Sequence, residues 1–457
     1  MSEQSAPYNQ IDFIIKAPVF RIVFSYMDDK GVAFVREYLL RLLKLTPLKP
    51  EQIARYFGFN QHETEVALAD LEQNKWISWQ DDGSIVLSKE GEHLFDSNNE
   101  SNSPKIPTLK EFSDEYRMEL LDNNFFHKKD SDTLYQNAIE LSVEPKILSE
   151  CKEIARKSFQ NRFLHLIEEN IVDKKGISLY KIDVIEQKNW CYFRFTQAFE
   201  ILPTTGEAKE QCDIAQLFHQ NNIQQAITEK INSLHADNWR ELCSSMAEIG
   251  DEDSGNILSN GQLDFSQFLK ILEKYEQKKG LYFLGQIYHH EQIFEKIKKI
   301  TDKLDKQSSY KCYWLAPSDI YWGKQRKIHD KIQSLIDQLK QKNYDFRLYL
   351  PLPPEKNKHE KQEWQREFKD LSDKKILYGF REGFLNGNTE ILFLENQFAV
   401  VCYHAQLSAY PVTLPIGFMT TKKEKVKHIQ NLVEKYLSSI KYISEEPQEN
   451  DFGKLTD

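Results

Sequence analysis

Four apolar, strand-type runs constrain the fold of residues 309–404 more than any other feature of the chain. They are rich in aromatic and β-branched residues, which favours buried strands, and the segments 324–341 and 360–372 between them have helical spacing. Strands that alternate with helices predict an α/β module, whose last run folds into a hairpin at 395–397. The runs are SYKCYWLAP (309–317), DFRLYLPLP (345–353), KILYGF (375–380) and NTEILFLENQFAVVCYH (388–404).

A chain of 457 residues is too long for a single core. We therefore expect a multidomain protein of mixed α+β and α/β class. The polar, proline-containing segment 96–108 predicts one linker, and a second break is expected at 249–261. These breaks predict a first domain over 1–98, a mainly helical middle domain over 108–275, an α/β domain over 276–446 and a disordered tail over 447–457.

Residues 33–96 contain a recognisable order of elements. A helical period over 33–45 is followed by a short helix that Pro50 begins, a turn through Gly58, and a second helical period over 62–76. WISWQDDGSIVLS then predicts a β-hairpin around an Asp-Gly turn. This order resembles a winged-helix domain over about 65 residues.

The resemblance implies DNA reading by the second helix of the turn, where His62, Thr64 and Lys75 are the candidate contacts. The same helix also carries Glu63 and Glu65, and carboxylates repel phosphates. Winged helices also serve as protein-interaction and dimerisation modules. Both interpretations stay open, with contact to a protein preferred.

The middle region is predicted to be mainly helical, with one β-hairpin. Residues 109–124 and 144–174 have helical patterns, and the alternating runs of 178–201 predict a hairpin that turns at 187–189. Glu186 and Lys188 form an ExK motif like that of restriction-type nucleases. Because the motif falls at the expected turn, we interpret it as surface.

The strand and helix order of the C-terminal region is similar to one half of a phospholipase D-like domain. In that family the catalytic HxK(x)4D motif occupies the first strand of the last hairpin. Here that strand has Asn388 where the histidine would be, Glu390 where the lysine would be and Glu395 where the aspartate would be. The resemblance therefore implies the fold without its active residues, because a histidine nucleophile and phosphate-holding lysines are lost.

A second HxK-like string, His329 and Lys331 with Asp337, has the wrong spacing and lies in a predicted helix. Residues two apart on a helix differ by about 200° and so point to opposite sides. We therefore expect no catalytic residue, no metal and no cofactor.

Charge is unevenly divided along the chain. Residues 1–98 carry a net −5 and 99–275 a net −10, whereas 276–446 carry +7, with 29 Lys/Arg against 22 Asp/Glu. A basic module with interleaved aromatics favours contact with a nucleic-acid backbone, DNA before RNA. A lysine-rich solvated exterior is the alternative. The candidate residues are Lys324, Arg326, Lys327 and Arg347.

Six scattered cysteines without metal-type spacing predict free thiols, and neither a signal peptide nor a bilayer-spanning run is visible. We therefore expect a cytoplasmic protein without a membrane partner. The favoured hypothesis is a non-catalytic adaptor or nucleic-acid-binding subunit, with a protein partner or a second copy of the chain. The combination of a winged helix with a phospholipase D-like domain in one chain also resembles some accessory proteins of bacterial restriction and anti-phage systems. The alternatives are a ligand-responsive winged-helix transcription regulator and an unusual nuclease or phosphodiesterase.

Overall fold

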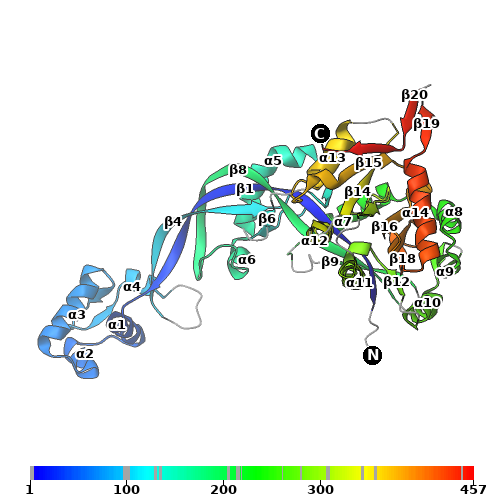
Figure 1. Ribbon diagram of the computed structural model, residues 1–457. Helices are drawn as coiled ribbons and strands as arrows, with labels where there is room; N and C mark the ends of the chain where they lie inside the picture. Colours follow the sequence, from blue (N-terminus) through cyan, green and yellow to red (C-terminus); the bar gives the residue numbers. More distant parts are fainter. Residues whose placement is uncertain are drawn as a thin grey trace.

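The protein is elongated, with a small helical unit at one end and a larger α/β domain at the other (Figure 1). The two ends are joined by a sheet of long antiparallel strands, which we call the strand ladder. The computed structural model describes residues 5–95, 103–127, 131–132, 136–202, 206–212, 217, 219–259, 261–277, 280–304, 309–340, 344–354, 358–443 and 446–456.

The first strand, β1 (Ala6–Gly31), spans the distance between the two ends. Its 26 residues, at about 3.3 Å each, cover about 85 Å. It pairs antiparallel with β4 (Lys105–Met118) on one side and with β8 (Ile177–Ile201) on the other. The sheet has the order β5-β4-β1-β8-β6, with β7 on β1 and β9 on β8; the short strands are β5 (Phe125–Phe126), β6 (Ser131–Asp132), β7 (Ile139–Leu141) and β9 (Ala208–Cys212).

The buried face of β1 changes part of the way along the strand. Phe13, Ile15 and Val19 belong to one core, whereas Phe20 and Phe24 belong to another. The buried positions therefore change from odd to even numbers after Val19, where the register with β8 also shifts between Pro18 and Phe20. The extra residue at this point lies in β8, because two steps along β1 oppose three along β8. The side chains of β1 therefore keep alternating, and its odd- and even-numbered residues face opposite sides of the sheet, so that one strand serves two cores.

The middle region contains more strand than the sequence predicted. The predicted helix that starts at residue 109 is wrong, because residues 105–118 form β4, and the hairpin predicted at 187–189 is wrong, because β8 continues through it. The cause is tertiary, since β1 offers both segments a long edge for hydrogen bonds. The linker predicted at 96–108 ends inside β4, and its residues 96–102 lie outside the described residues.

The predicted helices beyond residue 144 are present. Helices α5 and α6 cover the core formed by the second half of β1, while α7 packs in the core formed by its first half. These helices and the small hairpin near them are α5 (Pro145–Asn161), α6 (Phe163–Glu168), α7 (Asn221–Leu234), α8 (Trp239–Ile249), α9 (Glu252–Ile257), β10 (Leu258–Ser259), β11 (Gln262–Leu263) and α10 (Phe265–Gln277).

The small unit at the end of β1, which we call the helical tip, has the predicted order of three helices and a hairpin. Asn60 caps its third helix by accepting from the Glu63 amide, and Gly58 ends the second helix with φ of 73°. The unit is compact only from residue 33 onward, because residues 6–31 belong to β1. Its elements are α1 (Phe34–Leu45), α2 (Pro50–Phe57), α3 (Gln61–Gln73), β2 (Ile77–Trp79), β3 (Ile85–Leu87) and α4 (Lys89–His93).

The C-terminal domain is built on an eight-stranded mixed sheet of order β12-β18-β17-β16-β13-β14-β15-β21. Strands β13, β14 and β15 are parallel, and the other pairs are antiparallel. The α/β alternation and the last hairpin, β16–β17, are as predicted. The strands are β12 (Leu281–Leu284), β13 (Tyr310–Leu315), β14 (Tyr344–Leu352), β15 (Leu377–Arg381), β16 (Thr389–Leu394), β17 (Phe398–Ala405), β18 (Leu414–Thr420) and β21 (Asp451–Lys454).

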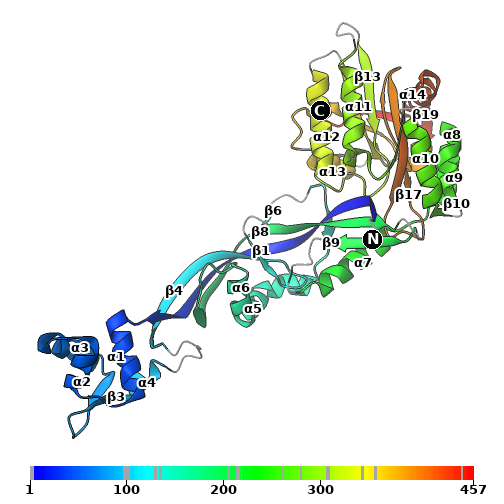
Figure 2. The ribbon, with the colours of Figure 1, turned by 90° about the horizontal axis from the view of Figure 1, so that it is seen from below.

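Helices cover both faces of this sheet (Figure 2). One core joins the sheet to α11 (Glu291–Thr301) and α12 (Lys327–Lys340), beside which lies α13 (Lys358–Glu367). The other joins it to α14 (Lys423–Leu437), α8 and α10.

The prediction of a disordered tail over 447–457 is wrong for most of that segment. Residues 446–449 form β20 (Glu446–Glu449), which pairs with β19 (Ile440–Ile443), and β21 extends the large sheet beside β15. The sequence signal was weak because an edge strand needs few apolar residues. Among the helices of the described residues, none has both the length and the apolar character that crossing a bilayer requires.

Candidate functional site

The predicted nucleic-acid contacts of the helical tip do not form one site. His62 is exposed in the first turn of α3, whereas Lys75 follows the last turn of this 13-residue helix, about 20 Å away. Thr64 is buried, and its hydroxyl donates to the carbonyl oxygen of Asn60 at 2.8 Å. Thr64 therefore contributes to the N-terminus of the helix.

The predicted basic contacts of the C-terminal domain are largely engaged within the chain. Lys324 lies 3.2 Å from Glu367, and Arg326 forms an ion pair with Asp132. Lys327 is exposed at the start of α12.

Arg347 lies 2.7 Å from Asp345, over the rings of Tyr313 and Tyr378. Three of the four predicted basic contacts are thus engaged by carboxylates of the same chain. A nucleic-acid role for these residues stays a prediction.

A buried polar cluster occupies the place where the phospholipase D-like motif would lie. The register of the β16–β17 hairpin pairs Glu390 with Cys402. His404 follows two residues later, and residues i and i+2 of a strand share a face. The three side chains are almost fully buried, and they lie on the sheet face covered by α11 and α12.

Glu390 is held by two tryptophans and one histidine. The indole N–H groups of Trp314 and Trp322 donate to Glu390 Oε1 at 2.7 and 2.8 Å. His404 Nε2 lies 3.1 Å from Glu390 Oε2. The carboxylate is therefore satisfied at both oxygens without contact to solvent.

His404 lies between two carboxylates. Its Nδ1 is 2.7 Å from Asp319 Oδ2, and Asp319 Oδ1 accepts from the Thr413 hydroxyl at 2.9 Å. Burial alone would lower the pKa of His404, but hydrogen bonds to Asp319, Cys402 and Glu390 outweigh it and raise that pKa well above its usual value.

Asn388, at the position of the family's nucleophile, is also enclosed. Its side-chain amide lies 2.9 Å from the carbonyl oxygen of Leu385 and from Ser245 Oγ. A carboxamide is a poor nucleophile, and the carboxylate of Glu390 would repel a phosphoryl group. The polar side chains at this hairpin position are thus engaged in hydrogen bonds within the chain.

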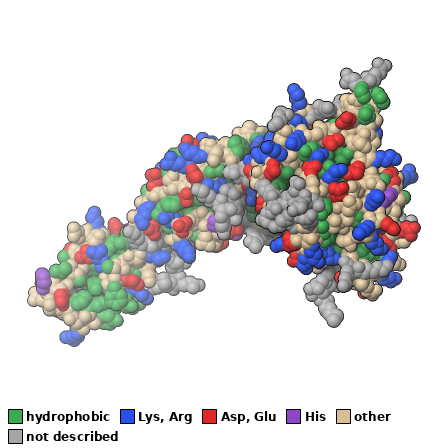
Figure 3. Space-filling view, viewed as in Figure 1, with side chains coloured by type: hydrophobic (Ala, Val, Ile, Leu, Met, Phe, Trp, Pro, Cys, Tyr) green, Lys and Arg blue, Asp and Glu red, His purple; other side chains and the backbone are tan. Residues whose placement is uncertain are grey.

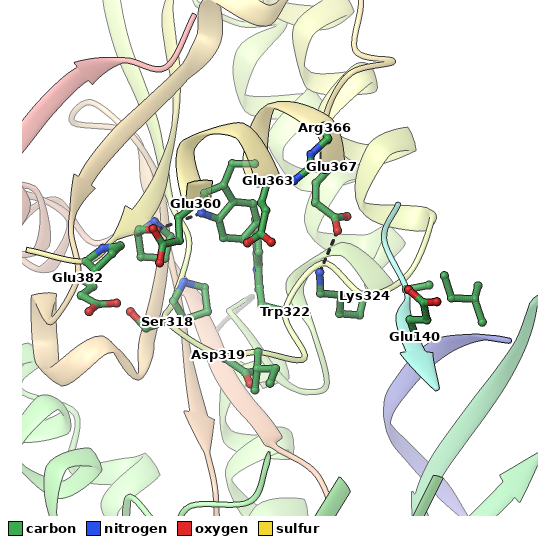
Figure 4. Close-up of a pocket in the computed structure, with 17 residues that line it drawn as sticks. Glu140, Ser318, Asp319, Trp322, Lys324, Glu360, Glu363, Arg366, Glu367 and Glu382 are labelled. Carbon is green, nitrogen blue, oxygen red and sulfur yellow. Dashed lines mark hydrogen bonds and ion pairs between the residues drawn. The ribbon is translucent and has the colours of Figure 1, made fainter. Parts of the chain in front are cut away.

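A pocket of about 680 Å³ opens beside this cluster (Figure 4). Asp319 and Trp322 belong to both the cluster and the pocket wall. The pocket also includes Ile14 of β1 and Glu140 of β7, so the middle sheet forms part of its wall. Trp364 forms another part, with its indole N–H donating to the carbonyl of Pro351 at 3.1 Å.

Carboxylates dominate the pocket. Glu360, Glu363 and Glu367 lie at i, i+3 and i+7 of α13, which places them on one helix face. Oε2 of Glu360 is buried without a hydrogen-bond partner among the described residues. Burial, and then the charge of Glu360, raise the pKa of Glu382. With Lys324 and Arg366 as its cations, the pocket favours a positively charged guest.

Cys402, His404, Asp319 and the two tryptophans were not predicted as site residues. The predicted hairpin turn at 395–397 contained the necessary signal for the first two. Counting outward from residue 396 places residue 402 opposite Glu390, with His404 on the same face. Asp319 and Trp322 come from the loop between β13 and α12, whose position relative to the hairpin no local pattern predicts.

Comparison with protein-family models, with curated proteins and with solved structures gives no significant match. The winged-helix and phospholipase D-like resemblances therefore rest on the order of elements alone.

Proposed function

We propose that the chain is a non-catalytic adaptor that forms a homodimer through the solvent-facing side of α1. In this arrangement two helical tips of winged-helix type meet, and each long strand ladder carries a C-terminal domain away from the contact. The expected nucleic-acid contacts, the anti-phage setting and the cytoplasmic location remain predictions of the sequence.

The observation that carries this proposal is an exposed apolar stripe on α1. Phe34, Tyr38 and Leu45 are 73%, 43% and 81% exposed. At 100° per residue they fall within about 40° of one another around the helix. The opposite face, with Leu39 and Leu43, packs into the core of the tip. A surface helix that is apolar on its outer face as well as its inner face typically binds a partner through the outer one.

The stripe is complementary to itself. When two copies of α1 pair antiparallel about a two-fold axis at its centre, Phe34 of one copy lies opposite Leu45 of the other. Tyr38 then lies opposite Arg41, whose guanidinium already sits 5.7 Å from the Tyr38 ring within one chain. Apolar side chains also gather on the helical tip in the face shown in Figure 3.

The state of association tests the proposal. Analytical ultracentrifugation of the full chain at micromolar concentrations should give a dimer. Phe34→Glu and Leu45→Glu should weaken it by at least ~10-fold, because each buries a charge at the contact. Leu164→Glu is the matched control, since Leu164 is an exposed leucine of α6 that is remote from the tip.

Disulfide trapping tests the antiparallel geometry. In a background without the exposed Cys243, mixed Phe34→Cys and Leu45→Cys chains should cross-link to each other, and neither should cross-link to itself. A monomer at all concentrations, or cross-linking of residue 34 to residue 34, would overturn the proposal.

A second candidate function is a ligand-responsive regulator, and the composition of the pocket wall favours it. Ile14 lies in the wall and belongs to β1, which continues without interruption to the helical tip. A guest in the pocket would therefore contact the strand that carries the tip. The carboxylate lining suits an amine or guanidinium guest.

Calorimetric titration with spermidine and with agmatine tests this function. Binding should be lost in Glu360→Gln and kept in Glu168→Gln, an exposed glutamate of α6. DNA fragments should then bind differently with and without the amine. A salt-dependent profile that is blind to sequence and to the amine would count against a regulator.

A further inference from the structure

Three different donor groups converge inside the C-terminal domain. A carboxylate oxygen of Glu390, the thiol of Cys402 and a ring nitrogen of His404 lie within 4.8 Å of one another. All three side chains are at most 1% exposed. We propose that they form a binding site for a divalent transition metal, for which Zn²⁺ is the best match.

The donor set selects the metal. Calcium and magnesium prefer oxygen ligands alone, whereas thiolate, imidazole and carboxylate together suit zinc and its neighbours. Zinc also tolerates the low coordination number that a closed interior allows. The carbonyl oxygen of Gly285, 3.8 Å from Cys402 Sγ, borders the same space.

Two of the proposed ligands, His404 and Glu390, are already oriented by hydrogen bonds to residues outside the site. Asp319 holds Nδ1 of His404, which leaves Nε2 directed at the site. Trp314 and Trp322 hold Oε1 of Glu390, which leaves Oε2 directed there. Metal-binding histidines and carboxylates are typically fixed by such outer hydrogen bonds, and a carboxylate–histidine pair is a common form.

Binding of a metal ion requires the donor atoms to be unprotonated. Zinc binds thiolate sulfur and the free nitrogen of a neutral imidazole, so any proton on Cys402 Sγ or His404 Nε2 leaves to solvent when the ion enters.

The strand register explains how the sequence builds the site. Glu390 and Cys402 are directly opposed in an antiparallel pair, where Cβ atoms approach to about 5 Å. His404 supplies the third donor from the same face of β17. The β16–β17 hairpin thus brings all three donor groups to one place.

Cobalt substitution tests the proposal directly. The full chain is produced in zinc-supplemented medium and its metal content is measured, and Co²⁺ is then exchanged into it during refolding. We expect one zinc per chain, together with the thiolate-to-cobalt charge-transfer band and intense visible bands of a low-coordinate Co²⁺ site. Cys402→Ser should lose the charge-transfer band, and His404→Gln should lower Co²⁺ affinity at least ~10-fold.

Two controls separate this site from surface binding and from misfolding. Cys243→Ser removes an exposed thiol and should leave the spectrum unchanged. Circular dichroism shows whether Cys402→Ser is folded. Zinc should also raise the melting temperature of the unmodified chain and leave that of Cys402→Ser unchanged, because a ligand stabilises only the state it binds.

A chain without stoichiometric metal, or a cobalt spectrum that persists in Cys402→Ser, would overturn the site. Neither outcome affects the proposed dimer, because α1 and the β16–β17 hairpin lie at opposite ends of the molecule (Figure 1).

Discussion

The main-chain N–H of Asp12 donates a hydrogen bond of 2.8 Å to the carbonyl oxygen of Lys324, which fixes β1 to the C-terminal domain. The Asp12 side chain extends the connection by accepting from Arg194 at 2.9 Å. Arg194 also holds Asp132, to which Arg326 is paired. The junction of the two sheets is therefore a largely buried network of opposite charges.

Removal of Arg194 should destabilise the protein strongly. Arg194→Leu leaves the buried Asp12 carboxylate without its cation and removes one of the two cations at Asp132, and breaking a buried pair in this way typically costs about 3–5 kcal/mol. Lys188→Leu is the matched control on the same strand, because its ion pair with Glu186 is exposed and such pairs contribute about 0–1 kcal/mol. Urea unfolding of both variants measures the difference. Equal losses in the two variants would contradict the role of the network.

Stability should decline as the pH falls from about 6.5 to about 4. Burial lowers the pKa of His289 and of His290 to about 4, below the value in the unfolded chain. In that window the unfolded state binds more protons, so the stabilisation is complete above pH 6.5 and is lost as the pH falls through 4. Each histidine contributes up to roughly 3 kcal/mol.

His290→Phe should flatten this dependence by about half, because it removes one of the two groups. The Phe283 ring, 4.8 Å from that of His290, leaves an aromatic environment for the new side chain. Thermal melts at pH 7 and pH 4.5 give the slope. An unchanged slope in His290→Phe would show that His290 does not contribute to the acid sensitivity.

Local sequence predicted the helical tip and the C-terminal alternation well. In both, the period of the pattern, Gly58 and the Asp-Gly turn act within a few residues. The strand ladder was missed because its signal is not local. The buried positions of β1 change from odd to even numbers after Val19, and β4 carries Phe112 and Tyr116 at a spacing that also fits a helix. Only the pairing with β1 determines that this segment is a strand and not a helix.

The site follows the same rule. The phospholipase D-like resemblance drew attention to the position of Glu390, and a count of the hairpin register would have placed His404 on the same face. The position of Asp319 could not be predicted in this way. It lies in a loop after β13 and faces His404 only because β13 and β17 lie two strands apart in the same sheet. The sequence also did not indicate that Arg326 and Lys324 form ion pairs with Asp132 and Glu367, because these partners are far apart along the chain.

Truncation of Glu390 should be far more damaging than its neutralisation. Glu390→Ala removes the acceptor of two buried indole N–H groups and one partner of His404. We expect a loss of about 3–5 kcal/mol in the free energy of unfolding. Glu390→Gln keeps an acceptor for the indoles and should lose less. Glu395→Gln, in the hairpin turn, is the control and should change stability by less than about 0.5 kcal/mol. Equal effects of Ala and Gln at residue 390 would contradict the hydrogen-bond account.

The chain should not cleave nucleic acid. A phosphodiester bond needs a nucleophile and cations at the phosphoryl group, and the hairpin presents Asn388 and Glu390 in an enclosed interior. The ExK residues, Glu186 and Lys188, lie in the middle of β8, exposed and paired with each other at 2.7 Å. Incubation of labelled DNA and RNA with the pure chain, with and without Mg²⁺, Mn²⁺ or Zn²⁺, measures turnover. We expect none above a buffer control. Cleavage that disappears in Glu390→Gln or in Glu186→Gln, but persists in Glu395→Gln, would establish a nuclease and end the non-catalytic interpretation.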